Sequence, residues 1–164
     1  MPRIGPQEKP EPTDVAFVLL PRFNMMSMAA LLEPMRIANY LAPRTLYRWE
    51  YLSAEAGDVV ASNGMRQATA KLAEAGDPST VLICGSWGAE HYHSTALLTW
   101  LRRLHRKGVR LVAVELGIYV LARAGLLGDG MATTHWSWMP GFAEQFPRVD
   151  MREQLYTVDG SIMT

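Results

Sequence analysis

The sequence predicts an α/β fold, a three-layer sandwich built around a mostly parallel central sheet. Residues 15–20, 80–84 and 109–114 form short, continuous apolar runs, a pattern typical of strands that are buried on both faces. Segments with helical periodicity separate these runs. Because strands that alternate with helices pair in parallel, we expect the three runs to be neighbours in one sheet with helices on both of its faces.

Length and composition are those of one globular domain. The chain has 164 residues, of which 49% are hydrophobic, a size that buries roughly 70% of the unfolded surface on folding. Its 16 basic and 16 acidic residues cancel, so the chain itself has no charge excess for binding a polyanion. Residues 1–13 contain four prolines and are predicted to be a disordered arm before a domain that spans 14–164.

The single cysteine, Cys84, excludes an internal disulfide and fits a reducing cytoplasm. At the end of a buried strand it is expected to be an inert thiol. No apolar run approaches the roughly 18 residues of a membrane span, and the N-terminus has no signal-peptide pattern. These features predict a cytoplasmic domain without membrane contact.

The elements of the first half follow from periodicity and turn residues. Ser27 is expected to cap a helix that ends near Leu41, with Pro34 kinking it. Residues 47–53 alternate as a strand, and a short strand is predicted at 59–61 between turns at 57–58 and 62–64.

The second half begins with a helix that has one apolar stripe: Leu97, Leu98, Leu101 and Leu104. Basic residues crowd its last turns before Gly108. They suggest DNA contact, but solvated cations that complement the helix dipole are the favoured interpretation. The remaining predicted elements are a helix to about Ala124, a loop over 125–130, a short strand over 131–135, a helix over 137–146, and a hairpin of 156–158 and 161–163 around Asp159-Gly160.

Residues 110–136 are the most informative part of the chain. The apolar run ends at Val114, is followed by Glu115 and Gly117, and changes at once into a helical stretch. In several hydrolases the apex of such a strand-to-helix turn holds a serine or cysteine nucleophile over the carboxyl edge of the sheet. Here the apex holds Glu115. Ligands of parallel sheets bind at that edge, where Gly85 is also predicted to lie.

Five motifs in order resemble a known family. They are Val15–Leu20, Glu33-Pro34-Met35-Arg36-Ile37-Ala38-Asn39, Ala61-Ser62-Asn63-Gly64, Ala122-Arg123-Ala124-Gly125-Leu126-Leu127 and Ala132-Thr133-Thr134-His135-Trp136. Over about residues 14–164 the chain is similar to the N-terminal sensing domain of GlxA-type, AraC-family transcription regulators. The resemblance implies a PfpI-like, class I glutamine-amidotransferase-like fold, which is flavodoxin-like, and a homodimer.

The same resemblance implies roles for three residues. In the enzymatic relatives the residue matching Glu115 is a cysteine, the one matching His135 is its partner, and the one matching Glu33 is a carboxylate near the thiol. The regulators carry a C-terminal AraC-type helix-turn-helix domain, which this chain lacks, so DNA contact is expected only through such a domain. The family also continues past Thr164 with a helix that packs on the sheet, so the domain is expected to be incomplete there.

A carboxylate is a poor acyl-transfer nucleophile, so no catalytic residue is assigned. Two buried carboxylates, Glu33 and Glu115, repel each other, and a cationic ligand relieves that repulsion, aided by aromatic faces. The expected effector is therefore a cationic or zwitterionic metabolite such as a betaine, carnitine or an amino acid. Backbone N–H groups near Gly85-Ser86 and Gly117 are expected to bind its carboxylate. The candidate ligand-binding set is Glu33, Gly85, Ser86, Trp87, Glu115, Leu116, His135 and Trp138.

Each candidate has a structural alternative. Glu33 has an ion-pair partner in Arg36, His135 can be a structural histidine, and Trp136 is expected to pack in the core. The residues His91, Tyr92 and His93 resemble half of a metal site but lack further ligands at suitable spacing, so neither metal nor cofactor is expected. Two other functions stay open: a PfpI-like hydrolase or amidase with an atypical site or a recruited Cys84, and a dimerisation module with a vestigial pocket.

Overall fold

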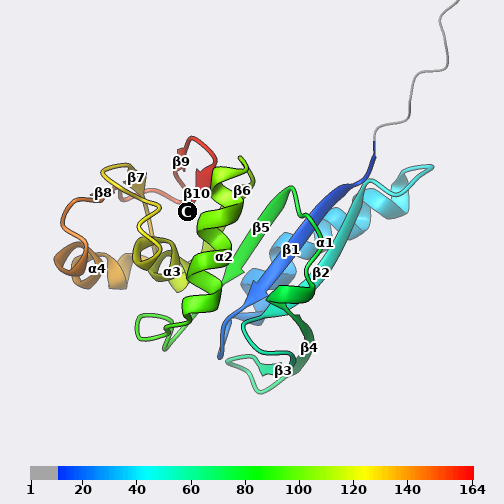
Figure 1. Ribbon diagram of the computed structural model, residues 1–164, viewed down its shortest axis with the longest axis horizontal. Coiled ribbons are helices and arrows are strands. Elements are labelled where there is room, and N and C mark those ends of the chain that lie inside the picture. The colour runs from blue at the N-terminus through cyan, green and yellow to red at the C-terminus, as the bar shows by residue number, and fades with distance from the viewer. Residues whose placement is uncertain (1–10) are drawn as a thin grey trace, which may run out of the picture.

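The computed structural model describes residues 11–164 and is organised around an eight-stranded sheet (Figure 1). The strand order is β3-β4-β2-β1-β5-β6-β10-β9. The strands are β1 (Thr13–Leu19), β2 (Tyr47–Ser53), β3 (Gly57–Val60), β4 (Arg66–Lys71), β5 (Thr80–Cys84), β6 (Arg110–Val114), β9 (Val158–Asp159) and β10 (Ile162–Met163). A second, two-stranded sheet pairs β7 (Met131–Ala132) with β8 (Asp150–Met151).

Between residues 11 and 164, four α-helices and three 3-10 helices connect the strands. They are α1 (Met25–Leu41), α2 (Thr95–Arg106), α3 (Ile118–Arg123) and α4 (Met139–Gln145), with η1 (Leu72–Glu74), η2 (Glu115–Gly117) and η3 (Trp136–Trp138). Within the described residues, no helix combines the length and the apolar character needed to cross a membrane.

The three predicted core strands are adjacent, parallel and buried. Phe17 of β1 lies beside Leu82 of β5, which in turn lies beside Val112 of β6. The prediction of a mostly parallel sheet is therefore confirmed, and β2 has the predicted bounds. Most of the predicted disordered arm, residues 1–10, lies outside the described residues, whereas Thr13 already begins β1.

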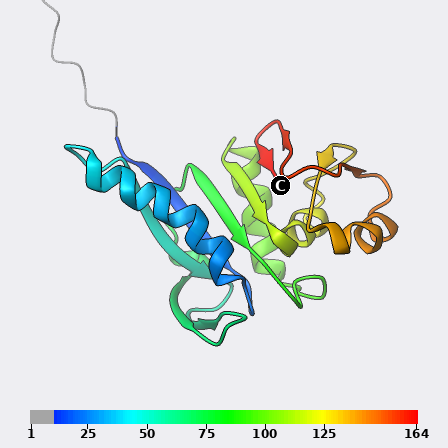
Figure 2. The ribbon, with the colours of Figure 1, turned by 180° about the vertical axis from the view of Figure 1, so that it is seen from behind.

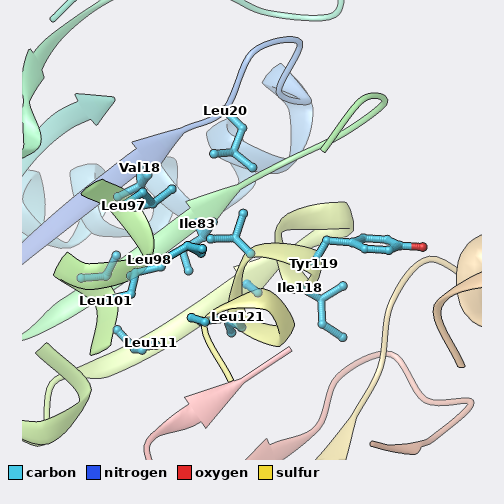
Figure 3. Packing of buried hydrophobic residues seen from close by; sticks show 14 of the residues in the cluster. Val18, Leu20, Ile83, Leu97, Leu98, Leu101, Leu111, Ile118, Tyr119 and Leu121 are labelled. Carbon is cyan, nitrogen blue, oxygen red and sulfur yellow. The ribbon is translucent and has the colours of Figure 1, made fainter. Parts of the chain in front are cut away.

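Alternating side chains of the core strands point to opposite faces of the sheet. On one face Val18, Ile83 and Leu111 pack against the apolar stripe of α2 and against α3 (Figure 3). On the other face Phe17 and Leu82 pack with residues of α1, which lies on the opposite side of the sheet from α2 (Figures 1 and 2). This arrangement gives the three layers.

Several details differ from the sequence expectation. The cap of α1 is Asn24, whose side chain accepts hydrogen bonds from the backbone of Met26 and Ser27, so the helix begins two residues before Ser27. The strand expected over 131–135 ends at Ala132. The short strands β4 and β8 have no counterpart among the predicted elements, because neither has a continuous apolar run.

The sheet is not covered by helices on both faces along its whole width. Helix α1 covers β1 and its neighbours, but Val112 and Val114 of β6 and Met163 of β10 line a cavity of about 690 Å³ on the same face. Figure 2 shows that no described helix lies over this part of the sheet. The cavity opens beside the turn that follows β6.

Candidate functional site

Glu115 is the apex of a sharp turn between β6 and α3. Its φ is 56°, in the left-handed region that side-chain-bearing residues rarely adopt. Such a residue stores strain, and strained residues cluster at functional sites. The predicted elbow is therefore confirmed, with a carboxylate at its apex.

Two glycines allow the elbow to lie directly against β5. A Cβ atom on Gly117 would lie 2.4 Å from the carbonyl oxygen of Ile83, and one on Gly85 would lie 2.6 Å from the backbone nitrogen of Gly117. Leu116 between them is buried in the core. Gly85, Leu116 and Gly117 are thus buried where the elbow packs against β5, and none of them is among the residues that line the cavity described below.

The Glu115 carboxylate is held from the start of α1. Its Oε1 accepts hydrogen bonds from Ser27 Oγ at 3.1 Å and from Asn24 Nδ2 at 3.3 Å. No described residue donates a hydrogen bond to Oε2. On the other side, Thr134 Oγ1 donates to the backbone oxygen of Glu115 at 3.1 Å. The apex is therefore fixed in place while one carboxylate oxygen stays available.

The 690 Å³ cavity beside the elbow has the size of a small-molecule site, for which about 300–1,000 Å³ is usual. Most of its walls are apolar, and polar side chains enter at the elbow. Its lining consists of Leu31, Val112, Ala113, Val114, Glu115, Thr133, Thr134, His135, Trp136, Met139, Glu153, Gln154, Leu155, Tyr156, Met163 and Thr164.

Of the predicted site residues, Glu115 and His135 line this cavity together. His135 is exposed, its Nδ1 lies 2.8 Å from Ser137 Oγ, and its ring stacks on Trp136 with 5.5 Å between the ring centroids. Trp136 was expected in the core but is 74% exposed. The reason is that it begins η3 at the mouth of the cavity, a position that its apolar character does not reveal.

Six predicted site residues lie outside the cavity lining: Glu33, Gly85, Ser86, Trp87, Leu116 and Trp138. Glu33 is exposed and forms an ion pair with Arg36 at 2.7 Å, and this partner lowers the pKa of the Glu33 carboxyl. It lies six residues beyond Ser27, about 9 Å farther along the helix. The structure therefore does not form the expected pair of carboxylates. Trp138 is partly buried and packs against the core.

Trp87 lies on the loop after β5 and is 59% exposed, and Ser86 before it is half-buried. The guanidinium carbon of Arg22 lies 5.8 Å from the centroid of the Trp87 ring. Arg123 of α3 also holds this loop. Its guanidinium donates hydrogen bonds to the backbone oxygens of Ala89 and Tyr92, each at 3.1 Å. The loop carrying Trp87 is thus held by an arginine at each end.

Sequence reasoning missed four residues around Glu115 and Trp87: Arg22, Asn24, Ser27 as a partner of Glu115, and Thr134. A signal existed for two of them. Asn24 is a good capping residue directly after a buried strand, and Thr134 belongs to the motif that contains His135. Nothing in the sequence connects Ser27 with Glu115, because the contact joins residues 88 positions apart.

Cys84 is buried at the end of β5, and burial raises the pKa of its thiol to about 12. The predicted inert thiol agrees with this environment, since a cysteine reacts as the thiolate. Among residues 11–164, no three histidine, cysteine, aspartate or glutamate side chains are grouped so that they could hold a metal ion.

Comparison of the sequence with known proteins finds no matching family model. It does find curated relatives that are transcription regulators. The chain is 37% identical over 165 residues to the HTH-type transcriptional regulator GbdR of Pseudomonas aeruginosa, covering 99% of this chain and 44% of that protein. It is 38% identical over 152 residues to the HTH-type transcriptional regulator GlxA of Rhizobium meliloti, covering 92% of this chain and 47% of that protein. The chain thus spans less than half the length of these relatives.

Solved structures share the fold. An AraC family transcriptional regulator from Pseudomonas putida superposes with a TM-score of 0.79 at 22% identity, covering 93% of this chain and 82% of that one. A putative transcriptional regulator from Vibrio parahaemolyticus gives 0.81 at 26% identity, with 93% and 83% covered. A ThiJ/PfpI domain protein from Brachyspira murdochii gives 0.74 at 14% identity, with 94% and 87% covered. The predicted PfpI-like, class I glutamine-amidotransferase-like fold is confirmed.

Proposed function

We propose that this chain, which is homologous to the N-terminal part of GlxA-type transcription regulators, is a non-catalytic sensing domain of an AraC-family regulator. Its effector is a small cationic or zwitterionic metabolite. One observation carries the proposal. The carboxylate of Glu115 occupies the strained apex at which hydrolases place a nucleophile, it lines a cavity of ligand size, and one of its oxygens accepts from no described residue.

The chemistry of the cavity favours a cationic head group. A half-buried carboxylate oxygen that lacks a donor gains charge-assisted contacts from a cation. The exposed ring of Trp136, in the same lining, offers a face that a quaternary ammonium group prefers. Methyl or methylene groups buried against walls such as Val114 and Met139 add about 0.8 kcal/mol per carbon. Betaines, carnitine and amino acids combine these features.

The same residues argue against covalent catalysis. A carboxylate is a weak nucleophile for acyl transfer, and the thiol of Cys84 stays protonated at neutral pH because burial raises its pKa to about 12. His135 directs Nδ1 to Ser137 rather than to a thiol. These observations support a binding role over a PfpI-like hydrolase.

A homodimer in the cytoplasm is part of the proposal, with DNA contact through another domain of the full regulator. Large apolar side chains are exposed near the end of α1, among them Tyr40 at 82% and Leu41 at 75%. Such a surface favours association with a second copy. It also keeps a second candidate open, a dimerisation module with a vestigial pocket. Only a bound effector separates the two.

Calorimetric titration tests the proposal. Glycine betaine, carnitine, choline and L-arginine are titrated into the wild type, into Glu115→Gln, and into the matched control Glu33→Gln. We expect saturable binding of at least one probe, at least 10-fold weaker in Glu115→Gln and unchanged in Glu33→Gln, because Glu33 lies outside the cavity lining. Equal binding by wild type and Glu115→Gln, or no binding of any probe, contradicts the proposal and favours the dimerisation module.

A further inference from the structure

Arg22 has an unusual backbone conformation. Its φ of 63° makes it, with Glu115, one of two residues other than glycine with positive φ among residues 11–164. The Phe23 N–H donates to the Leu20 carbonyl at 3.0 Å, so residues 20–23 form a β-turn with proline at its second position. Positive φ at the third position alone defines a type II turn, which strongly prefers glycine there. The chain instead places an arginine side chain at this point.

The position of Arg22 mirrors that of Glu115. Arg22 follows β1 and Glu115 follows β6, and these strands flank β5, whose following loop carries Trp87. Because β1, β5 and β6 are parallel, their carboxyl ends lie at one edge of the sheet (Figure 1), and all three residues come directly after that edge. Two residues with positive φ and opposite charge thus follow the two strands that flank β5. Strain of this kind persists only where the surrounding structure maintains it, and it gathers at binding sites.

The guanidinium of Arg22 is oriented but not neutralised. It lies over the Trp87 ring at 5.8 Å, and none of the ion pairs among the described residues includes it. An arginine stays protonated at every relevant pH, and its fork of donors matches a carboxylate. Its donors are therefore free to bind an anionic group that a ligand brings.

We propose that Arg22 and Trp87 form a carboxylate-binding subsite opposite Glu115, so that the site selects zwitterions over simple cations. The inference rests on the proposed function and extends it. It offers an alternative to the backbone cradle expected from sequence, in which Gly85 and Gly117 are both buried. Glu115 then binds the cationic head, Arg22 binds the carboxylate, and the distance between them limits the length of the ligand.

Matched probes isolate the carboxylate. Tetramethylammonium is glycine betaine without its carboxylate, and agmatine is L-arginine without its α-carboxylate. The variants are Arg22→Asn, because asparagine tolerates left-handed backbone, Arg22→Lys, which keeps the charge without the fork, and the control Arg106→Gln. Arg106 is exposed at the end of α2, shortly before β6 begins. It therefore lies toward the edge of the sheet opposite to the one that Arg22 follows.

We expect the wild type to bind the zwitterion of one pair at least 10-fold tighter than its decarboxylated partner. Arg22→Asn should remove this preference by weakening the zwitterion 10- to 100-fold while leaving the simple cation unchanged. Arg22→Lys should recover part of the preference, and Arg106→Gln should keep all of it. Circular dichroism and thermal unfolding show that each variant is folded.

The outcomes separate this inference from the proposed function. A zwitterion bound equally well by wild type and Arg22→Asn overturns the carboxylate subsite and leaves the proposed function standing. If the wild type binds simple cations as tightly as zwitterions, the carboxylate subsite is likewise overturned and the proposed function still stands. A wild type that binds none of the four probes contradicts both.

Discussion

Ser27 in the first turn of α1 donates a hydrogen bond to Glu115 at the apex of the elbow, with 3.1 Å between Oγ and Oε1. The bond joins the helix on one face of the sheet to the turn that opens the candidate site. Helix α1 thus contacts Glu115 through its first turn, while its other end exposes Tyr40 and Leu41. One helix therefore joins a partner of Glu115 to the proposed dimer surface.

The first prediction concerns this bond. Ser27→Ala removes a donor from a half-buried, charged acceptor and should lower the free energy of unfolding by about 1–2 kcal/mol. Urea denaturation measures the change. Ser62→Ala is the control, because Ser62 is exposed and its hydroxyl makes none of the hydrogen bonds found among the described residues. Equal stability of the two variants means that the bond does not hold the elbow.

The second prediction concerns the contact between the elbow and β5. Gly117→Ala places a methyl group 2.4 Å from the Ile83 carbonyl oxygen, so it should destabilise the protein by at least about 2 kcal/mol. Gly141→Ala in α4 meets nothing within 4 Å and should be neutral or stabilising by up to about 1 kcal/mol. Thermal unfolding of both variants tests the difference. If Gly117→Ala is as stable as the wild type, Gly117 does not lie as close to the Ile83 carbonyl as described.

The third prediction concerns the strained turn at Arg22. Arg22→Gly relieves a left-handed residue and should raise the free energy of unfolding by about 1 kcal/mol. Arg22→Val should lower it, because a β-branched residue is least compatible with positive φ. If Arg22 binds a ligand carboxylate, Arg22→Gly gains stability and loses zwitterion affinity together. If Arg22→Gly is less stable than the wild type, the positive φ of Arg22 does not cost stability.

The fourth prediction concerns pH. The pKa of Cys84 rises from 9.0 to about 12 on folding because the thiol is buried. Above about pH 9 the unfolded thiol ionises while the native thiol stays protonated, so the native state loses stability as pH rises from 9 toward 12. Cys84→Ala should show a smaller loss over that range in urea titrations. Native Cys84 should also react slowly with Ellman's reagent at pH 8, and rapid labelling of folded protein shows that burial does not protect the thiol.

Much of the fold could be predicted from sequence because its strongest determinants are local. Continuous apolar runs marked β1, β5 and β6, and the change from a β-branched run to a helical one marked the elbow at Glu115. The cap of α1 was misplaced because asparagine and serine both cap helices well, and only the backbone path after β1 decides between Asn24 and Ser27.

The site was harder to predict because it depends on tertiary contacts. Glu33 occurs in a family motif, but its rotation about α1 points it to Arg36 and solvent. Trp136 is apolar, yet it is exposed at the cavity. Arg22 follows proline at a strand end, where turn chemistry favours glycine, so its importance emerges only from its φ and from the ring of Trp87.

The most direct test of the central claim follows the indole N–H resonances of the five tryptophans during titration with glycine betaine. A ligand held between Arg22 and Glu115 should shift Trp87 and Trp136 saturably, in wild type but not in Glu115→Gln. It should leave Trp100, a buried residue of α2 that packs in the core, unmoved. Resonances of Trp87 and Trp136 that stay in place at millimolar betaine, or that move equally in Glu115→Gln, contradict a zwitterion site at the elbow.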